Sequence, residues 1–117
     1  MKSIKGPGIF LAQFLRNEEP YNNLENIAQW ARMLGFNGVQ IPTWERHLID
    51  LDKAAESNDY CQEFVGKLEE IGLEITELSA HLQGQMLVVH PAYETAFRGF
   101  HPKGQTPEQR TAWAADQ

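Results

Sequence analysis

The stretch Leu24 to Pro42, LENIAQWARMLGFNGVQIP, joins an amphipathic helix to a short apolar strand. Asn23 stands before it as a helix N-cap, and apolar residues then recur at the three- and four-residue spacing of one helix face. Gly35 supplies the backbone freedom that ends such a helix. Gly38 to Ile41 follow as a strand, which Pro42 stops. The stretch therefore predicts a helix that leads into a buried strand.

Further strands and helices are expected on both sides of this unit. In chain order they are a buried strand at Ile9–Phe14, a helical turn at Leu51–Ala55, a helix at Tyr60–Ile71 and a strand at Glu74–Leu78. Asp59 and Gln62 resemble a capping box for the second helix, and Gly72 ends it. Strands that alternate with helices predict a parallel sheet with right-handed crossovers.

Two α/β architectures use such units. A doubly wound nucleotide-binding fold usually has a Gly-rich loop after its first strand, but Leu15–Pro20 follow here. A (β/α)8 TIM barrel tolerates long loops after its strands and places its site there. The irregular segments of this chain also follow its expected strands. We therefore expect an α/β fold that is a partial TIM barrel, with its first three or four βα units. Thr106 is expected to cap a helix that continues to Gln117 without a stop signal, so residues 1–117 are expected to be the N-terminal portion of an incomplete barrel domain.

The composition is that of a globular protein, with 42% hydrophobic and 22% charged residues. The formal charge of -6 and the sequence pI near 5.1 argue against a nucleic-acid partner, because such binding draws on clustered Lys and Arg. Cys61 is the single cysteine, so an internal disulfide is excluded and a reducing compartment is favoured.

The N-terminus faintly imitates a secretory signal, since Lys2 and Lys5 precede the apolar residues Ile9–Ala12. The breaker Gly6–Pro7 interrupts the approach, and Gln13 ends the apolar run early. No apolar run has the length of a membrane span. A cytoplasmic protein without a membrane partner is the resulting expectation.

Residues at the carboxyl ends of barrel strands face the site, and this rule selects several polar and aromatic side chains. Trp44 follows the second strand and could stack on the apolar face of a sugar ring. His81 and Gln83 follow the third strand and offer hydrogen bonds to sugar hydroxyls. In the alternative interpretation, Trp44 packs under its own loop and His81 is an ordinary loop histidine.

The segment Leu82–Gln105 has no clear long element but contains several polar and aromatic residues, among them His90. Val88–Val89 suit a short strand, and Ala92–Phe97 suit a helical turn. Long loops in compact domains are often binding loops or lids. A lid over a polyol-sized pocket and an ordinary excursion with aromatic anchors both stay open.

A complete metal site is not expected from this stretch alone. The four histidines (His47, His81, His90 and His101) share none of the spacings that place metal ligands on one helix face. Carboxylates such as Glu45, Asp50 and Glu77 could complete a site only by tertiary proximity. No nucleophile is indicated either, because Cys61 lies on the inward face of its helix and Ser79 has no partner motif.

Two segments, Gly38–Trp44 and Glu77–Gln85, carry a family resemblance. Together with the Leu34–Gly38 turn and His90–Tyr93, they resemble the N-terminal part of the sugar phosphate isomerase/epimerase family, which has the xylose-isomerase-like TIM barrel fold. The resemblance implies isomerisation or epimerisation of a sugar or polyol by proton removal next to a carbonyl. It also implies a divalent metal (Mn, Mg, Co or Zn), and two glutamates that exchange the proton.

The family's metal-binding and proton-transferring carboxylates, and its ligand histidine, belong to later barrel strands. The resemblance therefore assigns no catalytic or metal residue to this stretch. It implies a substrate-binding role for four residues, Trp44, His81, Gln83 and His90.

Three classes of function compete. The first is a sugar or sugar-phosphate isomerase/epimerase that needs a longer chain, and the second is a sugar-binding module or inactive fragment without catalysis. The third, an endonuclease-like DNA repair protein, is disfavoured by the negative charge. Because three or four parallel strands leave edges unpaired, the remainder of the barrel or further copies of the chain are expected as partners.

Overall fold

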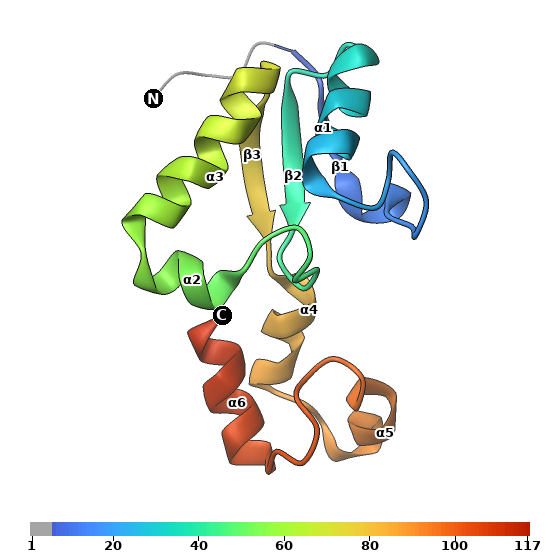
Figure 1. Cartoon of the computed structure of the whole chain (residues 1–117). Helices are drawn as coiled ribbons and strands as arrows, with labels where there is room; N and C mark the ends of the chain where they lie inside the picture. The colour runs from blue at the N-terminus through green and yellow to red at the C-terminus, as the bar shows by residue number, and fades with distance from the viewer. Residues whose placement is uncertain (1–5) are drawn as a thin grey trace. The chain divides into compact units, whose positions relative to one another are not determined.

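A computed structural model describes residues 6–117 of the chain, so Lys2 and Lys5 lie outside the described part. The chain divides into two compact units, residues 1–79 and 80–117. The first unit is a mixed α/β unit with a three-stranded parallel sheet in the order β1-β2-β3 (Figure 1). None of the helices within residues 6–117 combines the length and the apolar character that crossing a bilayer requires.

The elements of the first unit follow the predicted alternation. They are β1 (Gly8–Phe10), the 3-10 helix η1 (Leu11–Phe14), α1 (Leu24–Met33), β2 (Gly38–Pro42), α2 (Leu51–Glu56), α3 (Asn58–Ile71) and β3 (Glu74–Ser79). The parallel α/β organisation that the sequence predicts is thereby confirmed.

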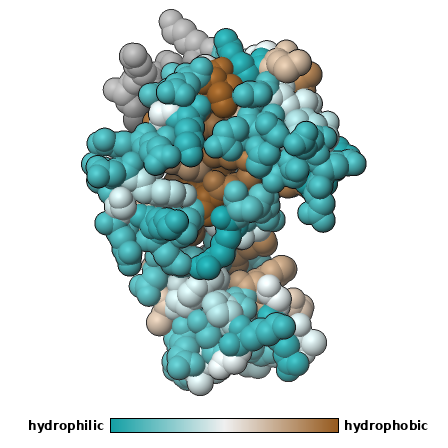
Figure 2. Space-filling view, viewed as in Figure 1, coloured by the Kyte–Doolittle hydropathy of each residue, from teal (hydrophilic) through white to brown (hydrophobic). Residues whose placement is uncertain are grey.

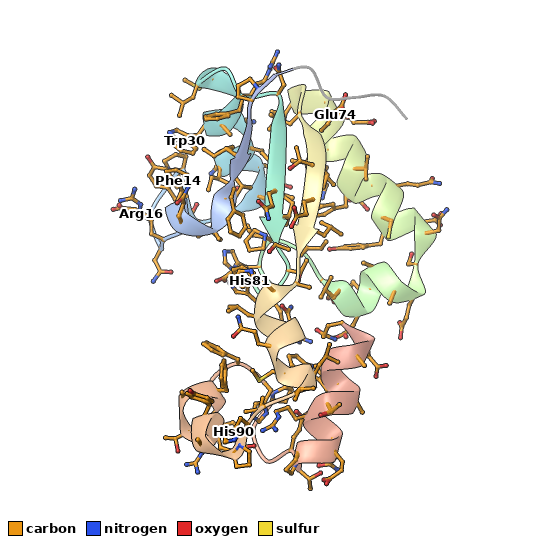
Figure 3. All side chains as sticks on the ribbon, turned by 180° about the vertical axis from the view of Figure 1, so that it is seen from behind. Phe14, Arg16, Trp30, Glu74, His81 and His90 are labelled. Carbon is orange, nitrogen blue, oxygen red and sulfur yellow. The ribbon has the colours of Figure 1, made fainter. Side chains whose placement is uncertain are left out.

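The first strand is shorter than predicted. Leu11–Phe14, expected to continue the strand, turns into η1 instead. The turn brings the ring centre of Phe14 to 5.0 Å from that of Trp30 on α1 (Figure 3), and the ring centre of Tyr21 lies 5.3 Å from the same indole. Packing of the loop after β1 onto α1 therefore takes the place of a longer strand.

The N-caps of α1 and α3 were both predicted from the sequence, and the structure confirms the first prediction but not the second. Asn23 caps α1 as predicted, since its side chain accepts a 2.9 Å hydrogen bond from the Asn26 amide. The predicted capping box of Asp59 and Gln62 is wrong. Ser57, extended just before α3, accepts the Tyr60 amide at 3.2 Å, and Asp59 instead lies in the first turn.

The two long helices cover one face of the sheet. Apolar residues from that face of the strands, from the helices and from the connections between them form the core: Leu11, Leu24, Ile27, Ala28, Ala31, Val39, Ile41, Leu48, Ile49, Phe64, Leu68 and Leu73. The space-filling view shows hydrophobic side chains as a strip between hydrophilic ones over this unit (Figure 2). Seen from behind, the strands lie in front of α1 and α3, and no helix of the described first unit covers this second face (Figure 3).

A bulge between β2 and β3 determines which β3 side chains reach the uncovered face. Val39 pairs with Ile75, but the next residue, Gln40, pairs with Glu77. Thr76 is therefore an extra residue in β3, as in a β-bulge. Since paired residues of parallel strands point to the same side, Gln40 and Glu77 both point away from the helices.

The second unit consists of short helices and one longer one. They are α4 (His81–Gly84), η2 (Gln85–Leu87), η3 (Pro91–Tyr93), α5 (Glu94–Phe97) and α6 (Pro107–Asp116). Thr106 caps α6 as predicted, with a full capping box to Gln109. The helical turn expected at Ala92–Phe97 is confirmed, whereas Val88–Val89 is not a strand, and Val88 is 89% exposed.

Candidate functional site

The carboxyl ends of β2 and β3 are tied together by Thr43. Its amide and its hydroxyl both donate 3.0 Å hydrogen bonds to the carbonyl oxygen of Ser79. Both side chains are buried. The two strand ends from which site loops would emerge are therefore held at a fixed spacing.

The loop after β2 is anchored to the hydrophobic core by two of its own residues. Leu48 and Ile49 are 5% and 3% exposed and belong to the core, and both donate their backbone amides to the Glu45 carbonyl. Their burial directs the preceding side chains, those of Glu45 and His47, outward. A rigid loop of this kind can hold polar groups in position for a ligand.

A cavity of about 290 Å³ lies between the loops after β1 and β2. Its walls are formed by Leu15, Arg16, Asn17, Asn22, Glu45 and His47. Five of these six side chains are able to form hydrogen bonds, and they include permanent donors as well as a carboxylate acceptor. The volume is at the low end of small-molecule sites, which suits a single sugar or polyol.

Three contacts hold polar groups of this cavity in place. Nδ1 of His47 lies 3.3 Å from Oε2 of Glu45, and the guanidinium of Arg16 lies 4.3 Å from the ring centre of Tyr21. Arg16 also lies 3.5 Å from the carboxylate of Glu18. These contacts orient a cation, an imidazole and a carboxylate around one small space.

The predicted site residue Trp44 stands between Thr43 and Glu45 in the loop after β2. It is half-buried, and its ring meets the Phe10 ring edge to face with centres 6.1 Å apart. Phe10 ends β1, so the pair bridges the ends of two neighbouring strands. The contact agrees with packing under the loop and leaves part of the indole accessible.

A second polar group lies on the uncovered face of the sheet. Nε2 of Gln40 donates a 2.9 Å hydrogen bond to Oε1 of Glu77, and Thr76 is exposed beside them. This pair presents a carboxylate and an amide on the face of the sheet opposite α1 and α3.

The other three predicted site residues belong to the second unit. His81 is exposed at the start of α4, and Gln83 on the same helix is buried at 3% exposure. His90 is exposed and caps η3, because its Nδ1 accepts the Ala92 amide at 3.1 Å. His81 and His90 lie apart within this unit (Figure 3), so they do not form one cluster.

The described residues do not provide a metal site by themselves. No group of three His, Cys, Asp or Glu side chains comes together within residues 6–117. Glu45 and His47 form a pair without a third donor. Within residues 6–117, this donor set does not fit a divalent metal.

Sequence reasoning missed Arg16, Asn17, Asn22 and Gln40. The first three lie in a loop, and their convergence on Glu45 and His47 depends on two connections meeting at one sheet edge. The rule that barrel sites follow strand ends selects this region but not its members. Gln40 had no signal, because it lies inside a strand and faces Glu77 only through the bulge.

Comparison of the chain with protein-family models and with curated proteins found no match.

Proposed function

We propose that this chain binds a sugar or polyol at the carboxyl end of its sheet, as part of a sugar or sugar-phosphate isomerase/epimerase that moves a proton next to a carbonyl. The observation that carries the proposal is the polar cavity between the loops after β1 and β2. In a (β/α)8 barrel, the substrate site lies at this end of the strands.

The chemistry of the cavity suits a polyhydroxylated ligand. Each sugar hydroxyl both donates and accepts hydrogen bonds, and therefore needs donors and acceptors at short range. Arg16 and the two asparagine amides supply donors, and the carboxylate of Glu45 supplies an acceptor. A purely anionic or purely apolar ligand would use only part of this set.

The arrangement of the sheet supports a partial (β/α)8 barrel as the architecture of the proposal. Three parallel strands have their helices on one side, and parallel sheets are ordinarily covered on both faces. The polar pair of Gln40 and Glu77 on the other face suits a barrel interior better than a packed apolar core. The remainder of a barrel, or further copies of the chain, would close that interior.

In the proposal, a divalent metal belongs to the complete barrel and would polarise the substrate oxygens. The role of residues 6–117 is to bind and orient the sugar. Glu45, held by His47, accepts hydroxyl donors, and Arg16 and Asn17 hold oxygens from the other side. Trp44, at the same edge of the sheet, offers an apolar surface to the ring carbons.

A sugar-binding module without catalysis is the second candidate. It is favoured by the location of the whole cavity within one unit, since binding there requires no residue from elsewhere. The two candidates differ in whether a proton next to the carbonyl exchanges with solvent.

The test is an amide NMR titration of the chain with an aldose, a ketose and a polyol. We expect shifts confined to residues 15–17, 22 and 45–47. The variant Asn17→Ala should bind several-fold more weakly, since a hydrogen-bonding group of the cavity is lost. Asn58→Ala changes an exposed asparagine on α3, outside the cavity, and should bind like the wild type. Absence of any shift at the cavity with all three probes would contradict the proposal.

Catalysis is tested separately, by proton NMR of an aldose or ketose in D₂O with Mg²⁺ or Zn²⁺. Loss of the signal at the carbon next to the carbonyl indicates isomerase chemistry. Binding without exchange in the longest native form of the chain would favour the binding module.

A further inference from the structure

The second unit contains a cavity of about 270 Å³ between α5 and the start of α6. The charged side chains in its wall are those of Arg98, His101, Lys103, Arg110 and Glu94. Three of them, Arg98, Lys103 and Arg110, are permanent cations, and only one, Glu94, is a carboxylate. The chain as a whole carries a formal charge of -6, so this concentration of cations is contrary to the overall composition.

Arg110 is the buried member of the group. It is 5% exposed, and its terminal nitrogens donate hydrogen bonds of 2.7 and 3.0 Å to the two carboxylate oxygens of Glu94. Its Nε is also buried but has no hydrogen-bond partner in the described chain. A buried N-H without a partner is costly, and in a native protein it commonly indicates a bound ligand or water.

A second buried atom of opposite hydrogen-bonding sense lies in the same wall. Oε1 of Gln105 has no partner within the described residues either. The residues that line the cavity thus include Arg110 with an unpartnered donor, Gln105 with an unpartnered acceptor, and the exposed cations Arg98 and Lys103. A ligand that carries negative charge and hydroxyl groups would satisfy all four.

The N-terminus of α6, which carries a partial positive charge, also favours an anion in this cavity. Pro107, the first residue of this ten-residue helix, lines the cavity, and a helix N-terminus favours negative charge. The contribution is limited, because the Thr106 hydroxyl already accepts the Gln109 amide and Glu108 adds a carboxylate in the first turn.

We propose that this cavity binds a phosphate monoester, whose phosphate oxygens accept from Arg98, Lys103 and Nε of Arg110, and whose neighbouring hydroxyl donates to Oε1 of Gln105. A dianion balances the excess of cations, which a monocarboxylate does not. The cavity is larger than a phosphate ion, and it has room for the first carbons of an attached sugar or polyol. This site lies in the second unit and does not depend on sugar binding by the first.

The Glu94 carboxylate repels an anion in the cavity. It also competes with that anion for the hydrogen bonds of Arg110. Its pKa is held below the ordinary value of 4.5 chiefly by the hydrogen bonds from Arg110, and His101 and Arg98 lower it further by their charge. These cations therefore already act on a negative group in the cavity. The same positive charges would attract a phosphate that enters the cavity.

The test titrates the whole chain with three probes, namely inorganic phosphate, glycerol 3-phosphate and glycerol, followed by amide NMR and calorimetry. We expect both anions to shift residues 98–110, glycerol 3-phosphate to bind more tightly than phosphate, and glycerol to leave the cavity unperturbed. Equal binding of the two anions would assign the site to free phosphate and overturn the role of Gln105. Absence of shifts with both anions would overturn the proposal as a whole.

Exposed cations allow variants that leave the fold intact. Arg98→Gln and Lys103→Gln should each weaken binding about tenfold, as expected for the loss of one charge-assisted hydrogen bond. Arg46→Gln is the matched control, because Arg46 is an exposed cation in the first unit and should leave the affinity unchanged. Identical affinities of all three variants and the wild type would overturn the site.

Glu94→Gln separates a binding site from a purely structural ion pair. Removal of the carboxylate frees the terminal nitrogens of Arg110, so phosphate should bind more tightly than to the wild type. Phosphate should also raise the melting temperature of this variant more than that of the wild type. A variant that is destabilised and gains nothing from phosphate would show that the pair is structural and would contradict the proposal.

Discussion

Gln40 and Glu77 meet across β2 and β3, with the Gln40 amide nitrogen 2.9 Å from the Glu77 carboxylate. They are partners in register because Thr76 is accommodated as an extra residue between Ile75 and Glu77. Strict alternation after Ile75 would have pointed Thr76 away from the helices and Glu77 toward them. The bulge therefore keeps a carboxylate out of the apolar core.

Deletion of Thr76 should be tolerated. The shortened strand would alternate regularly, with Ile75 toward the helices and Glu77 opposite Gln40, so the free energy of unfolding should change by less than about 1 kcal/mol. Deletion of Ile75 is the control. It removes a residue packed on the core and should cost about 2 kcal/mol or more. Urea unfolding of both variants measures the difference, and equal losses would contradict the assignment of Thr76 as the extra residue.

Leu68 and Val65 lie one turn apart on α3 but differ in burial, with 1% and 39% of their surface exposed. Leu68→Ala should lower the free energy of unfolding by about 2–5 kcal/mol, because it leaves a cavity between α3 and the sheet. Val65→Ala should cost less than about 1 kcal/mol. Chemical denaturation followed by circular dichroism compares them. Similar costs would show that α3 does not present this face to the core.

Two glycines of the same helix region should respond to alanine in opposite directions. Gly72 ends α3 with φ of 86°, and an added Cβ would lie 3.2 Å from Nε of Arg32. Gly72→Ala should therefore destabilise the protein by about 1–2 kcal/mol. Gly66 lies within α3, with nothing within 4 Å of an added Cβ, so Gly66→Ala should stabilise by about 0.5–1 kcal/mol. Thermal unfolding gives the sign of each change, and a stabilising Gly72→Ala would be the contrary result.

The Glu94 carboxylate makes stability depend on pH. Because Arg110 lowers its pKa in the folded state, Glu94 contributes stability that is complete above the ordinary value of 4.5 and is lost as the pH falls through the lowered pKa. Glu94→Gln lacks this contribution. The difference in unfolding free energy between the wild type and the variant should therefore shrink as the pH falls below about 4.5. A difference that stays constant from pH 7 to pH 3 would contradict the ion pair.

Much of the α/β organisation could be predicted because it depends on local signals. Each of these signals acts within one turn of the helix end that it marks. They are the Asn23 cap, the glycine stops after α1 and α3, and the Thr106 cap. The structure has them where the sequence predicts them. Predictions failed where several residues competed for one role. Ser57 capped α3 in place of Asp59, and the residues after Phe10 left the sheet to pack on Trp30.

The candidate sites were less predictable, since each is assembled from separate segments. Trp44 was selected by its place after a strand, but its contact with Phe10 depends on the pairing of β1 with β2. The cavity of Arg16, Asn17 and Glu45 requires two loops to meet, and no pattern in either loop signals the other. The ion pair of Glu94 with Arg110 joins residues that ordinary helix patterns would leave on separate exposed faces.

The sequence by itself determined the succession of strands and helices, because apolar periodicity, caps and glycine stops are properties of short stretches of chain. Only the tertiary structure decided which polar side chains share a space, namely Gln40 with Glu77, Arg16 with Glu45, and Arg98 with Arg110. The physical reason is that hydrogen bonds and charges act over a few ångströms in space. Distances of that kind between residues far apart in the chain are set by strand register, bulges and loop packing, which local sequence does not encode.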